Sequence, residues 1–421
     1  MKPQNFEESL IWYVIIGTYV IYALGILFPV YSLLAWVLGG YLVFKILLQT
    51  ESTPPNEKIS IPWIIWLWVI CSLISLFTTY VGITDFKLGT NALIRAILGW
   101  FTSSAVIPLF LASGCLNIRP KLIYRAICIL CLQSLIAIPI AYAAYLINLP
   151  GILYTSPIER LIQNGPIFHE VGFYASEYGS DSIRLFLFAP WCPALGLVSN
   201  VYFFMALQES NKVWRYIGVV GAIAMNIVSV SRVALVSLPM VLILMWGLRN
   251  FTRPTVQITA GIVSFIAGIF STPLSNTATE LVDSFYNSRA DSSKVRAALQ
   301  RVGIEAWQEA PIWGHGTQKP GPPVLANMPI GSHHTWVGLL YTKGLVGFIA
   351  FLIPVLLSFL YLLTKAGDSK IAETSLSILL VILAFSFGEQ IDVLGYIVWP
   401  SLIIMGIAFK AKIKQPIFLS P

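Results

Sequence analysis

Residues 62–81 read PWIIWLWVICSLISLFTTYV and contain no charged side chain. Wound into an α-helix, a run of about 20 apolar residues spans the hydrocarbon core of a membrane. Similar runs recur along the chain, and each of them predicts a membrane span. The twelve predicted spans are residues 10–28, 30–48, 62–81, 92–113, 122–147, 185–207, 213–230, 233–248, 256–270, 335–363, 375–387 and 393–409.

The composition of the whole chain supports this prediction. Of its 421 residues, 57% are hydrophobic and 11% are charged, and the mean hydropathy is +0.78. Soluble domains carry about 25% charged residues, so a water-soluble enzyme and a disordered chain are both excluded. Strand-like alternation, the mark of an outer-membrane barrel, is absent. We therefore expect an all-α polytopic membrane protein, with one integral membrane domain over residues 1–421 and about twelve transmembrane helices.

The distribution of charge predicts the orientation. Twelve spans place both termini on one side, which then holds 15 of the 26 Lys and Arg residues but 7 of the 19 Asp and Glu residues. Because cytoplasmic loops carry the excess of Lys and Arg, we expect cytoplasmic termini. Residues 148–183 and 271–334 then form a first periplasmic loop and a large periplasmic loop before the tenth span. The net charge of +7 reflects the cytoplasmic loops and does not indicate a nucleic-acid partner.

This arrangement limits the possible chemistry. ATP is absent from the periplasm, so a reaction there needs a substrate that is already activated. The sequence has no Walker loop, which excludes an ATP-driven pump. The five cysteines lie in or beside apolar segments and indicate neither disulfides nor a zinc site. Because no acidic cluster has metal-ligand spacing, we expect a site without a metal ion or another cofactor.

All four histidines fall in the two polar stretches. His333 and His334 stand where the second stretch enters the tenth span, and imidazole is the usual group for proton transfer near neutral pH. Gly344 and Gly347 follow them at a spacing that lets another helix approach closely. The alternative is a helix cap with small-residue packing. The other two histidines are His169 and His315.

Two arginines are expected at the outer membrane surface. Arg232 joins two apolar runs with almost no polar loop, and Arg184 opens the sixth predicted span. Charged groups in this layer are costly and tend to be functional. A guanidinium suits a diphosphate because it stays charged and offers two parallel donors. The alternative is an interface anchor whose side chain reaches toward water.

A third arginine precedes a predicted amphipathic helix in the large polar stretch. Arg296 opens this segment, whose apolar face suggests a helix on or near the membrane surface. We expect Pro311 to end the helix, and Gly314 and Gly316 to form a tight turn. The alternative is an ordinary solvated helix face.

These motifs together resemble the O-antigen ligase and O-antigen polymerase superfamily of bacterial envelope glycosyltransferases. Its ligases carry a motif of the form His-[Asn/Ser/Gln]-x9-Gly-x-x-Gly. Here His333-His334, nine residues, Gly344, two residues and Gly347 fit that register, which favours His333 as the working imidazole. The sequence departs from the motif at His334, which stands where the family has an amide or a hydroxyl.

The arginine segments also resemble elements of this superfamily. Arg296 to Gly316 is similar to its arginine-helix-Pro-x-x-Gly-x-Gly element, and Ser231-Arg232 is similar to its Ser-Arg turn between two spans. Arg184 with Pro190 resembles its arginine before a Pro-containing span. The resemblance covers roughly residues 184–390, and it implies a GT-C-like membrane protein whose large periplasmic loop carries amphipathic helices before the tenth span.

The resemblance implies a metal-independent, inverting glycosyltransferase in the bacterial inner membrane, with its active site facing the periplasm. The donor would be a glycan on a polyprenyl diphosphate, and Arg232, Arg296 and Arg184 would bind the diphosphate. His333 would take the proton from an acceptor hydroxyl, with His334 as a second catalytic or orienting group. Gly314, Gly316, Gly344 and Gly347 would support the site.

Several functions remain open from the sequence. A ligase would transfer the glycan to a lipid A–core sugar or another terminal acceptor, whereas a polymerase would use a second lipid-linked glycan. A protein-directed glycan transferase shares the same chemistry. A small-anion transporter would need charges along a continuous path, but the charges lie mainly in the outer layer, with Arg95 in the fourth predicted span as the exception. A purely structural subunit would make the clustering of Arg and His on one side an accident.

Overall fold

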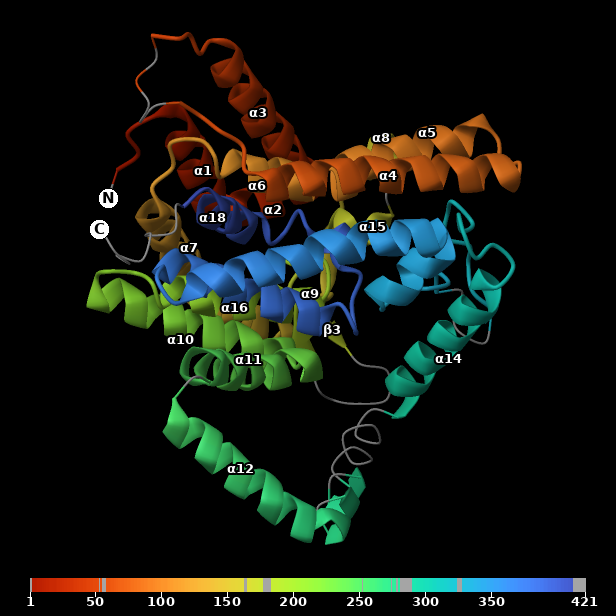
Figure 1. The fold of residues 1–421 in the computed structure, drawn as a ribbon. Coiled ribbons are helices and arrows are strands. Elements are labelled where there is room, and N and C mark those ends of the chain that lie inside the picture. Colours follow the sequence, from red (N-terminus) through yellow and green to blue (C-terminus); the bar gives the residue numbers. More distant parts are fainter. Residues whose placement is uncertain are drawn as a thin grey trace.

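The computed structural model describes residues 2–52, 54, 58–162, 165–176, 183–251, 253–273, 275–277, 279–280, 290–323 and 328–411. Parts of both predicted periplasmic loops lie outside these residues. The described chain is mostly helical, and several of its long helices run in a similar direction, whereas others are inclined to them (Figure 1).

The first third of the chain forms seven helices and one π-helical turn. Asn5 caps the first helix by accepting a hydrogen bond from the backbone of Glu8, and Pro120 suits the first turn of the last one because it has no N–H to lose. The elements are α1 (Phe6–Ile16), α2 (Thr18–Ala23), α3 (Leu27–Leu47), α4 (Trp63–Asp85), α5 (Thr90–Gly99), the π-helical turn η1 (Trp100–Ser104), α6 (Val106–Ser113) and α7 (Pro120–Leu146).

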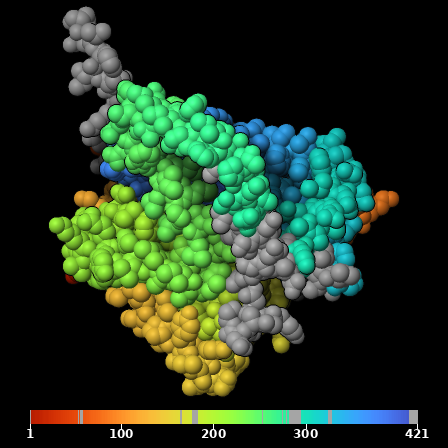
Figure 2. Space-filling model, turned by 90° about the horizontal axis from the view of Figure 1, so that it is seen from below, coloured from red at the N-terminus to blue at the C-terminus, as the bar shows by residue number. Residues whose placement is uncertain are grey.

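The remaining helices lie between or after the strands of two short sheets. They are α8 (Glu159–Ile162), the 3₁₀ turn η2 (Pro166–Phe168), α9 (Cys192–Ala206), α10 (Lys212–Ser229), α11 (Arg232–Asn250), α12 (Pro254–Ile269), α14 (Ala290–Trp307), α15 (Thr335–Ala366), α16 (Lys370–Phe385), α17 (Ile391–Leu394) and α18 (Trp399–Lys410). Seen from below, α12 stands out from the face that α10 and α11 form (Figure 2).

A helix lies in each of the twelve predicted stretches, but their lengths differ. Within the described chain, six helices are long and apolar enough to cross a membrane. A seventh is added if α12 and the short helix after it, bent by 84° against it, count as one span. The described chain is therefore a membrane protein with several spans, and the number twelve stays a prediction.

The first predicted loop holds strands, which the sequence did not predict. Strand β1 (Ile152–Thr155) pairs with β2 (Glu170–Gly172), and β3 (Tyr174–Ser176) pairs with β4 (Ile183–Leu185), both antiparallel. Arg184 lies in β4 and does not open a helix, because α9 begins only at Cys192. Such strands are too short to show the alternation on which a prediction rests.

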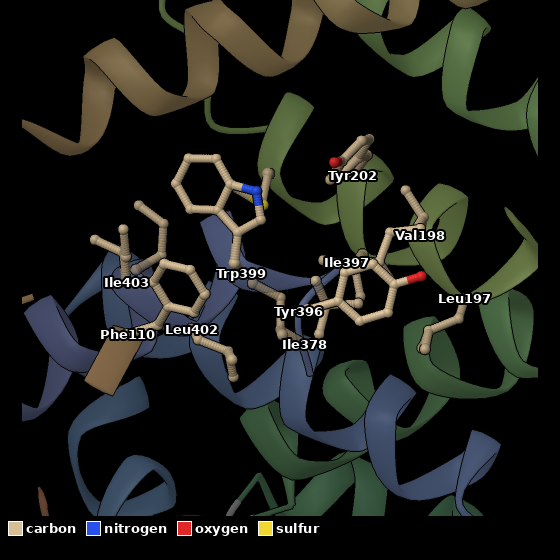
Figure 3. Close-up of a cluster of buried hydrophobic side chains, with 14 of the residues drawn as sticks. Phe110, Leu197, Val198, Tyr202, Ile378, Tyr396, Ile397, Trp399, Leu402 and Ile403 are labelled. Carbon is tan, nitrogen blue, oxygen red and sulfur yellow. The ribbon is translucent and has the colours of Figure 1, made fainter. Parts of the chain in front are cut away.

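The core lies where α6, α9, α16 and α18 meet (Figure 3). Trp399 stacks on Phe110 with ring centroids 5.4 Å apart, and Tyr202, Ile378 and Tyr396 surround them. All five side chains are buried. Close van der Waals contact of this kind holds helices together where lipid supplies no hydrophobic drive.

The two ends of the described chain lie at the same end of the molecule (Figure 1). The Asn5 amide donates to the Asn117 carbonyl, and the Lys410 ammonium donates to the Cys115 carbonyl, so both ends contact the turn between α6 and α7. Lys365, near the end of α15, donates to the Phe409 carbonyl at 3.0 Å. The other end of α15, with His333 and His334, is therefore at the opposite end of the molecule.

A break in α15 explains the glycine motifs. Gly344 has φ 64° and ψ −167°, so the helical hydrogen-bond ladder is interrupted there. Residues 311–316 fill the gap: Leu345 donates to the Pro311 carbonyl at 2.8 Å, and Gly316 donates to the Thr342 carbonyl at 2.8 Å. A Cβ at Gly344 would overlap the backbone of residue 312, and one at Gly314 would overlap α15 itself. These glycines allow backbone to pair with backbone.

We expect Gly344→Ala to prevent stable folding. The alanine would occupy a left-handed conformation and collide with a backbone carbonyl that cannot move aside, which costs more than about 2 kcal/mol. Gly40→Ala in α3 is the matched control because nothing lies within 4 Å of its new Cβ. Size-exclusion chromatography and thermal unfolding in detergent compare the two. Equal behaviour of both variants would show that the break does not need glycine.

Candidate active site

The beginning of α15 is fixed to the segment between α16 and α17. The backbone N–H of Thr335 donates to the Ser386 carbonyl at 2.9 Å, and the Thr335 hydroxyl donates to the Glu389 carbonyl at 2.6 Å. The same hydroxyl accepts from the Ile391 N–H at 2.9 Å. The indole of Trp336 donates to the Ser386 hydroxyl at 2.9 Å. These four bonds hold the two histidines before the helix against residues 386–391.

His334 caps α15. Its Nδ1 accepts a hydrogen bond from the Val337 N–H at 3.3 Å, as Asn or Ser does at other helix starts. Burial lowers the pKa of His334, which keeps the imidazole neutral and able to accept. The imidazole therefore does here what an amide or a hydroxyl would do at this position. This explains how the motif tolerates a second histidine.

We expect His334→Asn to preserve the cap and His334→Ala to lose it. Loss of an N-cap costs about 1 kcal/mol of stability. The thermal unfolding midpoint in detergent should therefore fall for the alanine variant and stay close to that of the parent protein for the asparagine variant. Equal destabilisation by both substitutions would show that the imidazole has a different role.

His333 differs from its neighbour in conformation and environment. Its φ of 61° is left-handed, a conformation that residues other than glycine seldom adopt and that is found often at functional sites. Burial, and then the nearby charge of Arg296, lower the pKa of His333 to about 4. The imidazole is therefore neutral at neutral pH, the state in which it can accept a proton.

Arg296 reaches this region from α14 and contacts a buried carboxylate. Its guanidinium donates to the Gly388 carbonyl at 3.3 Å and to Glu389 Oε1 at 3.4 Å. The indole of Trp191 donates to the other oxygen of Glu389 at 2.9 Å. Glu389 is 1% exposed, and burial raises its pKa against the opposing charges of Arg296 and Arg184. Arg296 therefore belongs to a fixed, charged cluster.

Glu389 was not predicted from the sequence. It stands in a short polar segment between the last two predicted spans, together with Asp392. Two acidic residues between apolar runs were the available signal, since ionised groups at a membrane surface are costly without a role. The partner Trp191 is 198 residues away in sequence, so no spacing could reveal the contact.

The other two predicted arginines border the same cluster. Arg184 donates from Nε to the Ser229 carbonyl at 3.4 Å, and its charge acts on Glu389. Arg232 is the first residue of α11, and Ser231 caps this helix. The next residue, Val233, lies beside Gly388, where a Cβ would be 3.3 Å from Val233 Cγ2. The structure thus gathers elements carrying all three arginines around residues 388–389.

A buried amide network supports the start of α11. The Asn200 side chain donates to the Ala234 carbonyl at 2.9 Å and to the Ser237 hydroxyl at 2.6 Å. The Asn226 side chain donates to Asn200 at 2.6 Å. Buried polar groups joined in this way fix a single arrangement of their helices. The network therefore orients the turn between α10 and α11 and, with it, Arg232 at the start of α11.

The predicted amphipathic helix is present with different bounds. Helix α14 ends at Trp307, not at Pro311, because residues 308–313 form turns that lead into the break in α15. Leu299 and Gly303 are buried, and a Cβ on Gly303 would come within 2.8 Å of Val337. The side of α14 that carries Arg296 therefore faces α15, whereas Arg301 is exposed.

The remaining histidines are placed in packed surroundings. His315 is stacked between Phe86 and Tyr341, with ring centroids 4.6 Å apart on both sides. His169 is buried beside Phe28, and neither ring nitrogen has a hydrogen-bond partner in the described chain. Gly314, Gly316, Gly344 and Gly347 lie at the break in α15 or beside α4. Gly314, Gly316 and Gly344 bring backbones together, whereas a Cβ at Gly347 would meet side-chain atoms of Lys343 and Thr78.

Among the described residues, no three His, Cys, Asp or Glu side chains are grouped so that they could hold a metal ion. The charged side chains around residues 388–389 are arginines with one carboxylate. Such a set can bind an anion and stabilise negative charge that develops on it.

Comparison with curated proteins gives no match. The sequence profile of a family described as O-antigen ligase matches residues 217–352. This segment runs from α10 into the second half of α15 and carries Arg232, Arg296, His333 and the glycines of the break. This match supports the resemblance to the O-antigen ligase and polymerase superfamily over this part of the chain.

Proposed function

We propose that the chain is a metal-independent, inverting glycosyltransferase that moves a preassembled glycan from a polyprenyl diphosphate to an acceptor hydroxyl, as an O-antigen ligase. The observation that supports this most is that Thr335, two residues after His333, is bonded to residues 386 and 389, beside the Gly388 and Glu389 groups that Arg296 contacts. A neutral imidazole beside anion-binding groups is the pairing that such a transfer requires.

The proposed reaction breaks one bond and forms one. The acceptor oxygen attacks the anomeric carbon from the face opposite the diphosphate, and His333 takes the hydroxyl proton. The bond between the anomeric carbon and the diphosphate oxygen breaks, and the polyprenyl diphosphate leaves with the electron pair. Arg232, Arg296 and Arg184 stabilise the negative charge on the leaving group. Attack from the opposite face inverts the configuration at the anomeric carbon.

The acidic side of the pH profile should report His333. Its pKa lies below the usual 6.5, so the imidazole stays neutral as the pH falls and becomes protonated only near pH 4. We expect kcat/KM, which reflects the free enzyme, to fall around that pH. The charge of Arg296 contributes to the lowered pKa of His333. In the residual activity of Arg296→Gln, the fall in kcat/KM should therefore occur at a higher pH. A fall in kcat/KM near pH 6.5 in the parent protein would contradict the buried position of His333.

The location of the protein is part of the proposal. We place it in the inner membrane with twelve spans and cytoplasmic termini. The two chain ends lie at one end of the molecule, and α15 carries His333 to the opposite end. With the termini in the cytoplasm, the site faces the periplasm. Residues 148–183 and 271–334 then form the two periplasmic loops.

Reconstituted vesicles test the function. We would supply a polyprenyl-diphosphate glycan with and without a lipid A–core acceptor, and separate the products by gel. Transfer of the intact glycan that depends on the acceptor is the expected result. A ladder of products from the donor alone would identify a polymerase of the same superfamily. Absence of any product, together with anion flux through the vesicle membrane, would overturn the enzymatic proposal in favour of a transporter.

A further inference from the structure

A polar cavity separate from the candidate active site lies at the same end of the molecule as His333. Its volume is about 510 Å³, and we name it the Arg95 cavity. It is formed by α4, α5, η1, α15, residues 316–318 and residues 390–393. The side chains that carry the argument are Arg95, Trp100, Thr342, Lys343, Gln390 and Asp392. Neither His333 nor the three arginines of the candidate active site line it.

The charges of the Arg95 cavity are incompletely paired. Arg95 is exposed to the cavity, and it makes no hydrogen bond or ion pair with any residue in the described ranges. The Lys343 ammonium lies 4.0 Å from Asp392 Oδ2, with side-chain exposures of 13% and 17%. The other oxygen of Asp392 has no hydrogen-bond partner within the described chain. Two cations facing one carboxylate leave a net positive charge for an anionic ligand.

The position of Lys343 is informative in itself. It lies on α15, one residue before the break at Gly344, in a helix long and apolar enough to span a membrane. Charged side chains in such helices are expensive and usually mark a binding site or a pathway. Arg95 likewise belongs to a helical stretch with the length and composition of a span. Both cations therefore need an explanation beyond packing.

The uncharged lining fits a sugar. Trp100 presents an aromatic ring, and its indole donates to the Ser72 carbonyl at 3.0 Å, which fixes the ring. Hydroxyl and amide side chains complete the wall, among them Thr342 and Gln390. These groups pair with sugar hydroxyls, and η1 is a π-helical turn of a kind that often occurs at functional sites. The combined chemistry selects a saccharide that carries a phosphate or a carboxylate.

The Arg95 cavity is close to the candidate active site without being part of it. Gln390 lines the cavity and directly follows Glu389, the residue that Arg296 contacts. Thr342 lies eight residues after His334, which corresponds to about 12 Å along a helix. A glycan held in the cavity can therefore extend one sugar toward His333.

We propose that the Arg95 cavity binds an anionic sugar of the acceptor glycan. This inference rests on the proposed glycosyl transfer. The three arginines near residues 388–389 are assigned to the donor diphosphate there, and the reaction needs a second glycan at the same end of the molecule. The Arg95 cavity supplies cationic and sugar-binding groups at that end, and Arg95 and Lys343 bind the anionic group.

The test compares acceptors that differ only in charge. Three oligosaccharide acceptors are used with reconstituted protein: a neutral oligosaccharide, the same oligosaccharide with one phosphate, and the same oligosaccharide with one carboxylate. We expect Arg95→Gln to raise KM about tenfold for the charged acceptor that fits, and to leave kcat and the donor KM unchanged. KM for the neutral acceptor should not change, and Arg95→Lys should restore part of the loss. The phosphate and carboxylate arms show which anion is bound.

Arg215→Gln is the control for loss of one positive charge, because Arg215 lies on α10 outside the cavity. Equal KM values for charged and neutral acceptors in the parent protein and in Arg95→Gln would overturn the assignment. A binding measurement distinguishes failure of the Arg95 cavity assignment from failure of the proposed glycosyl transfer. Fluorescently labelled charged oligosaccharide should bind the parent protein in detergent about tenfold more tightly than Arg95→Gln, whether or not transfer occurs. Equal binding to both would also overturn it.

Discussion

Replacing His333 by asparagine should strongly reduce glycan transfer while the protein still folds and inserts. General-base catalysis contributes about 10²- to 10⁴-fold, and kcat should fall by this amount. Asparagine is the sharpest substitution because it tolerates the left-handed conformation of residue 333 and keeps a polar side chain. The measurement is transfer by purified protein in vesicles, with the unreacted donor glycan quantified alongside.

His334→Asn is the matched control for this experiment. It changes the adjacent imidazole in the same way, but the new amide can replace the cap on Val337. We expect it to retain most of the activity. An inactive His334→Asn protein beside an active His333→Asn protein would reverse the two roles and show that the motif register misidentifies the working imidazole.

Replacing Arg296 or Arg232 by lysine should cost about 10²-fold in kcat. Lysine keeps the positive charge but cannot supply the two parallel donors that a diphosphate accepts. Removal of one donor that stabilises developing charge costs about 10²- to 10³-fold in other enzymes. For Arg296 the loss has a second source, because the bond to the Gly388 carbonyl disappears as well.

Arg301→Lys provides the comparison on the same helix, since Arg301 is exposed on α14. It should transfer glycan at the parental rate. Full activity of both Arg232→Lys and Arg296→Lys would rule out a bidentate clamp on the diphosphate and leave only a general attraction for anions.

The positions of the helices could be predicted from the sequence, because a span must satisfy its own backbone and therefore shows as a continuous apolar run. The breaks could not be predicted in the same way. The interruption at Gly344 exists because residues 311–316 replace the missing hydrogen bonds, a contact between distant segments. The π-helical turn at Trp100–Ser104 and the short strands around Arg184 are likewise decided by their neighbours.

The sequence could nominate single residues of the candidate site, and their catalytic and binding roles stay predictions. His333 and Arg296 were named from their positions, and the charge of Arg296 acts on His333 in the structure. Glu389 was missed, since its importance comes from burial and from contacts with Arg296 and Trp191. The glycines were recognised by their register, and in the structure Gly314, Gly316 and Gly344 allow backbone segments to pair at the break in α15.

The most direct test of the central proposal is to identify the lipid product of a single round of transfer. Vesicles containing the parent protein, donor, acceptor and EDTA should release one polyprenyl diphosphate for each glycan transferred, and His333→Asn should release far less. Release of polyprenyl monophosphate, or transfer that returns only when a divalent ion is added, would contradict a metal-independent reaction in which arginines stabilise the departing diphosphate.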